Sequence, residues 1–265
     1  MPRRGCRCGP GGERSVRMPP DFIDDDYPAD PYPGTRPDGS FVQVGGSGYH
    51  VEPSEDVPSR WTIEGRDLDE ELAEHGVAPL GERLPVLAYG SNVNPSKISW
   101  LRDRLGLRGP VVVIGARCHG IVAVWSAGVR ARDGQRPAVL AGMPGVIERH
   151  AVWLVTPDQR AVLDECEGRG QRYRLCEVHA PVRLDDGRVL ESVLAYTARP
   201  EALRPDVPIH LNRSPLVVDG HLVRCADVGQ DDAVRLVGEQ AASDGLLVAE
   251  IEGEPSGPTL AELYG

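Results

Sequence analysis

Glu167 is the residue best placed for acid–base chemistry, because it ends the most clearly marked predicted helix of the chain. Thr156, Pro157 and Gln159 form a capping-box pattern at the start of that helix, and Gly168 suits the position after its last turn. The negative end of the helix dipole and partial burial both disfavour an ionised carboxylate. Such a carboxyl suits a general acid or base. Without further evidence, a solvated carboxylate at a helix end is the ordinary alternative.

A second candidate is a polar turn that links a predicted buried strand at 84–88 to a helix starting with Asn94 as N-cap and Pro95. This turn directs backbone N–H groups and the positive end of a helix dipole at one point, which favours an anion or an oxyanion. Gly90 would allow close approach of a ligand or a positive φ. An ordinary strand-to-helix connection is the alternative. The residues of the turn are Tyr89, Gly90, Ser91, Asn92 and Val93.

Two sequence motifs together resemble the motifs of a known protein family. Tyr89-Gly90-Ser91-Asn92, followed downstream by Leu163-Asp164-Glu165-Cys166-Glu167-Gly168 and a tyrosine, resembles the γ-glutamylcyclotransferase-like family. That family carries a Tyr-Gly-Ser-Asn loop and a Leu-Asp-x-x-Glu-Gly segment whose last glutamate is the catalytic acid/base. The resemblance covers roughly 86–196. It implies an α+β fold, a small mixed β-barrel flanked by helices.

The resemblance implies an intramolecular acyl transfer in which the α-amine of a γ-glutamyl compound attacks its own γ-carbonyl, giving 5-oxoproline and a free amine. Glu167 would be the catalytic acid/base, and no metal or cofactor is implied. The resemblance also implies a set of substrate-binding residues, which are Tyr89, Gly90, Ser91, Asn92, Val93, Tyr173 and Tyr196. The loops at 126–137 and 203–215 are expected to shape the part of the pocket that holds the leaving amine.

Two other functions remain open from the sequence. One is a binding or regulatory module that keeps the fold and the pocket without turnover, although such a module would not need Glu167. The other is a related amide-cleaving or acyl-transfer enzyme that uses water or a different amine as acceptor. No Gly-x-Ser-x-Gly motif occurs in the sequence, and Ser91 has no assignable triad partner.

Composition narrows the class of partner. The 265 residues carry a net charge of −11, so we expect no nucleic-acid footprint for the whole chain. The six cysteines form no Cys-x-x-Cys framework, and the seven histidines show no metal-ligand spacing. No secretory signal and no run of eighteen apolar residues occur, which predicts a cytoplasmic protein that does not bind a membrane. The oligomeric state stays open.

The sequence suggests four segments. Residues 1–62 are a basic and then proline-rich, acidic arm, expected to be disordered or wrapped on the surface, so that its removal costs about 1 kcal/mol or less; an upstream start codon before Met18 would explain 1–17 equally well. Residues 63–83 form a linker with a short helix at 67–75, residues 84–242 the domain, and residues 243–265 a tail. Further predicted elements are strands at 111–114, 120–125, 138–141, 146–147 and 151–155, a hairpin of 173–178 with 189–196, and a helix at 231–240.

Overall fold

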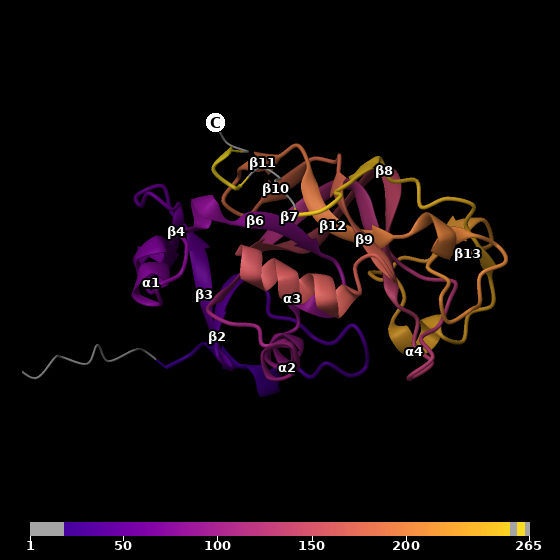
Figure 1. Cartoon of the computed structure of the whole chain (residues 1–265), viewed down its shortest axis with the longest axis horizontal. Coiled ribbons are helices and arrows are strands. Elements are labelled where there is room, and N and C mark those ends of the chain that lie inside the picture. Colours follow the sequence, from indigo (N-terminus) through magenta and orange to yellow (C-terminus); the bar gives the residue numbers. More distant parts are fainter. Residues whose placement is uncertain (1–18, 255–258, 263–265) are drawn as a thin grey trace, which may run out of the picture.

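The computed structural model describes residues 19–254 and 259–262, which form a mixed α+β fold with one large sheet and few helices (Figure 1). The helices are α1 (Leu68–Glu74), α2 (Pro95–Leu105), α3 (Pro157–Glu167) and α4 (Gln230–Ala233), with 3-10 turns η1 (Asp24–Asp26), η2 (Leu80–Glu82), η3 (Ser91–Val93) and η4 (Pro200–Leu203). The strands are β1 (Phe22–Ile23), β2 (Ser40–Val44), β3 (Ser47–Pro53), β4 (Trp61–Ile63), β5 (Arg66–Asp67), β6 (Leu84–Ala88), β7 (Val111–Trp125), β8 (Ala138–Val155), β9 (Tyr173–Val178), β10 (Val182–Leu184), β11 (Val189–Leu190), β12 (Val193–Ala198), β13 (Leu216–Val218), β14 (His221–Leu222), β15 (Glu239–Gln240) and β16 (Val248–Glu250).

The main sheet has the hydrogen-bonded order β16-β9-β12-β6-β8-β7-β2-β3-β4-β5, and a small second sheet has the order β14-β13-β15. Strands β12 and β6 pair in parallel at Leu194 and Val86, while β6 pairs antiparallel with β8. Because β6 lies between β12 and β8, the polar turn that follows β6 is held in the middle of the sheet. Closure of the sheet into a small barrel stays a prediction.

Side chains from both faces of the sheet are buried. On one face, Ile98 of α2 and Leu163 of α3 pack with Val86 and Trp153. On the other face, Leu68 of α1 belongs to a cluster that includes the next residue of β6, Leu87. Successive residues of a strand point to opposite faces, so a strand covered on both sides needs a continuous apolar run, as 84–88 has.

The three longest helices form where local sequence signals predict them. Asp67 caps α1, and the side chain of Asn94 caps α2 by accepting the Lys97 N–H at 2.7 Å. Thr156 and Gln159 make the predicted capping box on α3, and Gly168 ends α3 with φ of 63°. The helix predicted at 231–240 is wrong, because α4 is only 4 residues long and β15 follows it. Gly238 interrupts that stretch: a Cβ there would lie 2.3 Å from the Val217 carbonyl oxygen.

Several predicted strands are parts of longer ones. The apolar runs at 111–114 and 120–125 both belong to β7, and those at 138–141, 146–147 and 151–155 all belong to β8. The glycines between the runs do not end the strands; Gly120, with φ of 75°, sits at an irregularity in the β7–β8 pairing.

The predicted hairpin also differs from the observed strand pairing. Strand β9 does pair with β12, but the tight turn at 185–187 joins the shorter strands β10 and β11, which are inserted after Pro181.

The prediction of a disordered arm is wrong for residues 19–62. Strand β2 is an inner strand that pairs with β3 on one side and β7 on the other, and Phe41 and Val42 are fully buried. Gly45 and Gly46 supply the two-residue turn of the β2–β3 hairpin, a signal that the proline-rich, acidic composition obscures. The basic stretch 1–17, with Cys6 and Cys8, lies outside the described residues.

The boundaries predicted at 84 and 242 do not separate independent parts of the structure. Leu68 and Leu72 of the predicted linker are fully buried in the same core as the sheet. In the predicted tail, β16 pairs with β9, and Leu260 is buried in that core. These segments contribute large apolar side chains, so they fold with the domain. Among the described residues, no helix is long and apolar enough to cross a membrane.

Candidate active site

A pocket lies where the turn after β6 meets the C-terminal end of α3. Seven of the eight predicted site residues line it: Tyr89, Gly90, Ser91, Asn92, Glu167, Tyr173 and Tyr196. The eighth, Val93, is not among the lining residues, because its side chain is buried in the apolar core beneath the turn. The predicted residues are therefore brought together from four segments, which are the turn at 89–93, α3, β9 and β12.

Asn92 and Glu167 are in direct contact. The Nδ2 of Asn92 donates a hydrogen bond to Oε1 of Glu167 at 2.8 Å, across 75 residues of sequence. The turn η3 presents Asn92, and the capping box and Gly168 set the start and the end of the helix that presents Glu167. The two motifs of the sequence thus form one site, joined by a bond between their own polar side chains.

Glu167 is half-buried and faces the pocket. Burial raises the pKa of Glu167 above its ordinary value, while the Asn92 hydrogen bond and the charge of Lys97 act in the opposite direction. The backbone carbonyl of Glu167 accepts a hydrogen bond from Nε of Arg172 at 3.1 Å, which satisfies part of the helix end. Glu167 is thus a fixed carboxyl whose proton affinity is increased.

Gly90 has φ of −115°, so a positive φ is not the reason for glycine there. Close approach is the reason: a Cβ at Gly90 would lie 2.9 Å from the hydroxyl oxygen of Tyr32. Tyr32 belongs to the N-terminal segment that the sequence placed outside the domain. It lines the same pocket as Gly90.

Four tyrosines line the pocket, and their hydroxyls have different partners. Tyr89 donates to the backbone carbonyl of Tyr196 at 2.6 Å, and Tyr196 donates to Oδ1 of Asp164 at 2.7 Å. The hydroxyl of Tyr173 instead accepts a hydrogen bond from Nε of Arg213 at 3.1 Å. Burial raises the pKa of Tyr89, Tyr173 and Tyr196, so each keeps its proton near neutral pH.

The lining of the pocket is cationic although the chain is acidic overall. Glu167 is the only carboxylate among its described lining residues. The lysine and arginines that line it are Lys97, Arg130, Arg132, Arg172 and Arg213. Arg213 is buried and has no ion-pair partner among the described residues; besides Tyr173 it donates to the backbone carbonyls of His210 and Asn212. A site with this balance of charge favours an anionic ligand.

Sequence reasoning expected the loops at 126–137 and 203–215 at the pocket, and both contribute lining residues, Arg130 from the first and Arg213 from the second. It missed Tyr32 completely. The local signal for Tyr32 was weak, because prolines flank it in an acidic stretch. A group of three or more His, Cys, Asp or Glu side chains placed to hold a metal ion was not found among the described residues.

No protein-family model matches this chain, and no curated protein matches it. Similarity exists to solved structures. A gamma-glutamyl cyclotransferase is 20% identical, with 44% of this chain and 68% of that chain covered and a TM-score of 0.36. An uncharacterized protein from Homo sapiens has the same identity and coverage with a TM-score of 0.35. An AIG2-like protein from Mus musculus is 16% identical, with 49% of this chain and 88% of that chain covered and a TM-score of 0.34.

Proposed function

We propose that this protein is an enzyme that cyclises γ-glutamyl compounds, releasing 5-oxoproline and an amine. The observation that carries the proposal is the 2.8 Å hydrogen bond between Asn92 and Glu167 in a cationic pocket. The contact joins the Tyr-Gly-Ser-Asn turn to the glutamate of the Leu-Asp-x-x-Glu-Gly segment. The two motifs that carry the resemblance to the γ-glutamylcyclotransferase-like family thus lie at one place, which supports the proposal.

Glu167 would carry both proton transfers. As a carboxylate it accepts a proton from the substrate ammonium, so that the neutral α-amine can attack the γ-carbonyl carbon. A C–N bond forms and the carbonyl oxygen becomes an oxyanion. As the oxyanion collapses to a carbonyl, Glu167 gives its proton to the leaving nitrogen and the C–N bond of that nitrogen breaks. Glu167, again a carboxylate, then relays the second proton of the attacking nitrogen to the released amine, which departs as an ammonium ion. A raised pKa suits this alternation, because the group must both take up and release a proton near neutral pH.

The remaining groups would bind and orient the substrate. The backbone N–H groups of the turn at 90–93 would hold an oxyanion or a carboxylate, and Asn92 would keep Glu167 in position. Arg172 and Arg213 offer positive charge to the carboxylate that every γ-glutamyl compound carries, whereas Arg130 and Arg132 are paired with Asp133. Because the attacking amine and the carbonyl belong to one molecule, positioning supplies much of the rate.

The test is mass-spectrometric detection of 5-oxoproline after incubation with a panel of γ-glutamyl amides, dipeptides and isopeptides. We expect product from the wild type and a turnover lower by about 10²–10⁴-fold from Glu167→Gln. Glu165→Gln is the matched control, because that side chain is exposed on the same helix, and it should keep full activity. Free glutamate in place of 5-oxoproline would show that water is the acceptor. Ligand binding without any product would show a binding module, and near-normal rates in Glu167→Gln would exclude Glu167 as the base.

A further inference from the structure

Tyr32 lies outside both sequence motifs, yet it forms part of the pocket wall. Its segment, 27–35, is held at both ends by one side chain. Nδ2 of Asn94 donates to the backbone carbonyls of Tyr27, Pro28 and Thr35 at 3.0, 3.1 and 2.6 Å. Oδ1 of the same Asn94 caps α2, directly after the polar turn. The segment is therefore fastened to the turn itself.

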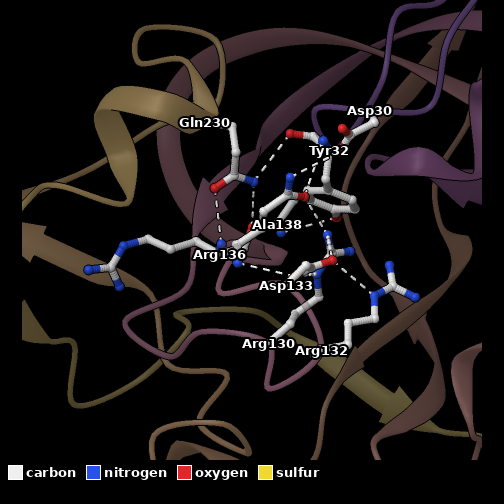
Figure 2. Close-up of polar contacts among 9 residues, drawn as sticks. Asp30, Tyr32, Arg130, Arg132, Asp133, Arg136, Ala138 and Gln230 are labelled. Carbon is white, nitrogen blue, oxygen red and sulfur yellow. Dashed lines mark hydrogen bonds and ion pairs between the residues drawn. The ribbon is translucent and has the colours of Figure 1, made fainter.

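Tyr32 is also fixed in the middle of the segment (Figure 2). Its backbone N–H donates to Oε1 of Gln135 at 3.2 Å, and its backbone carbonyl accepts from Nε2 of Gln230 at 3.2 Å. The guanidinium of Arg130 lies over the ring, 4.2 Å from the centroid. Contacts from the loop at 126–137 and from α4 thus set the position of Tyr32.

The hydroxyl of Tyr32 can still donate a hydrogen bond. Its oxygen accepts the backbone N–H of Ala138 at 3.1 Å, and a backbone N–H can only donate, so the hydroxyl must act there as acceptor (Figure 2). No hydrogen bond donated by this hydroxyl occurs among the described residues. The hydroxyls of Tyr89 and Tyr196, by contrast, already donate hydrogen bonds to protein oxygens.

The free donor lies beside the proposed anion site. A Cβ on Gly90 would be only 2.9 Å from the Tyr32 oxygen, so this hydroxyl and the start of the turn at 90–93 are in contact distance. Burial raises the pKa of Tyr32 far above the working range, and the group remains a donor throughout it. A hydroxyl donor next to backbone N–H donors is the arrangement that binds a carboxylate or a developing oxyanion.

We propose that Tyr32 is a substrate-contacting residue whose hydroxyl donates a hydrogen bond to the same anionic oxygen of the γ-glutamyl group that the turn at 90–93 holds. This inference rests on the proposed function and deepens it. It makes the N-terminal segment part of the active site. If the acceptor is a carboxylate of the substrate, loss of the hydroxyl should raise KM. If the acceptor is the oxyanion that forms during the reaction, loss of the hydroxyl should lower kcat.

The test is Tyr32→Phe, assayed for 5-oxoproline formation with γ-glutamyl-alanine and for binding of 5-oxoproline by calorimetry. Loss of one hydrogen bond to a charged oxygen should lower kcat/KM by about 10- to 100-fold. Tyr27→Phe is the matched control: it belongs to the same segment, packs edge-on against Phe22 with ring centroids 5.2 Å apart, and does not line the pocket. It should keep wild-type kinetics. Incorporation of 3-fluorotyrosine at position 32 keeps the hydroxyl and should restore activity.

A second variant tests the close approach of Gly90 and Tyr32 without removing the hydroxyl. Gly90→Ala should lower kcat/KM in the wild type, because its methyl group displaces the Tyr32 oxygen, and the loss should be smaller in a Tyr32→Phe background. Unchanged kcat/KM and affinity in Tyr32→Phe, from an active wild type, would overturn the inference and leave the proposed function standing. Absence of 5-oxoproline from the wild type with every substrate would instead count against the proposed function.

Discussion

The hydroxyl of Tyr196 donates a hydrogen bond to Oδ1 of Asp164 at 2.7 Å, and this bond ties α3 to the sheet. Asp164 lies one helical turn before Glu167. Its carboxylate also accepts from Arg160 and from Arg169. The aspartate of the Leu-Asp-x-x-Glu-Gly segment thus anchors the helix that carries Glu167, and Tyr196 holds the helix as well as lining the pocket.

Tyr196→Phe removes this bond and leaves the ring in place. A hydrogen bond to a carboxylate contributes about 1.5–3 kcal/mol, so we expect the free energy of unfolding to fall by about that amount. Because Glu167 loses an anchor and the substrate loses no contact, kcat should decrease with little change in KM. Urea unfolding together with steady-state kinetics checks this. Wild-type stability in the variant would show that the bond does not hold α3.

Glu167→Gln should make the protein more stable at neutral pH. Burial raises the pKa of Glu167 above its ordinary value of 4.5. Folding therefore favours the protonated form of Glu167. The stability that this form gives to the folded state is complete below about pH 4.5 and is lost as the pH rises through the raised pKa. At about pH 7.5 the variant should melt at a higher temperature than the wild type. The difference should shrink towards pH 4.5, and an equal difference at both pH values would contradict this.

Glu148 has the opposite pH dependence. Burial alone would raise its pKa, but the imidazole of His150, whose Nε2 lies 3.2 Å from Oε1, and hydrogen bonds from the backbone N–H of Ala123 and from Arg224 lower it to about 2. Stability from this carboxylate is present above its ordinary pKa of 4.5 and is lost as the pH falls towards 2, by at most about 3 kcal/mol. The stability difference between wild type and Glu148→Gln, measured by urea unfolding, should therefore be large at about pH 6 and small near pH 2. A stability difference that is the same at both pH values would show that folding does not lower the pKa of Glu148.

The N-terminal strands should be essential for folding. Phe41 of β2 is fully buried, so Phe41→Ala should lower the free energy of unfolding by about 3–5 kcal/mol. Val237→Ala, at a side chain that is 92% exposed, should change it by less than about 0.5 kcal/mol. A chain without residues 1–62 loses β2 from beside β7 and should not fold. Cooperative unfolding of that shortened chain at the wild-type midpoint would disprove the role of β2.

Local signals predicted those parts of the site that neighbouring residues control. The cap of α2 by Asn94, the capping box of α3 and the left-handed Gly168 each depend on atoms within a few residues, so the sequence pattern is sufficient. The same kind of signal failed at 231–240, where Gly238 and the pairing of β15 with β13 override helix propensity.

The sequence by itself determined that Glu167 ends a capped helix and that a polar turn at 89–93 starts another, because caps and turns are short-range. The meeting of Asn92 with Glu167 was expected only from a family resemblance. The entry of Tyr32 into the pocket was not expected at all. It depends on pairing between β2 and β7, and on Asn94, Gln135 and Gln230 reaching the same short segment. Contacts between residues so far apart follow from how the whole core packs, and no local pattern contains them.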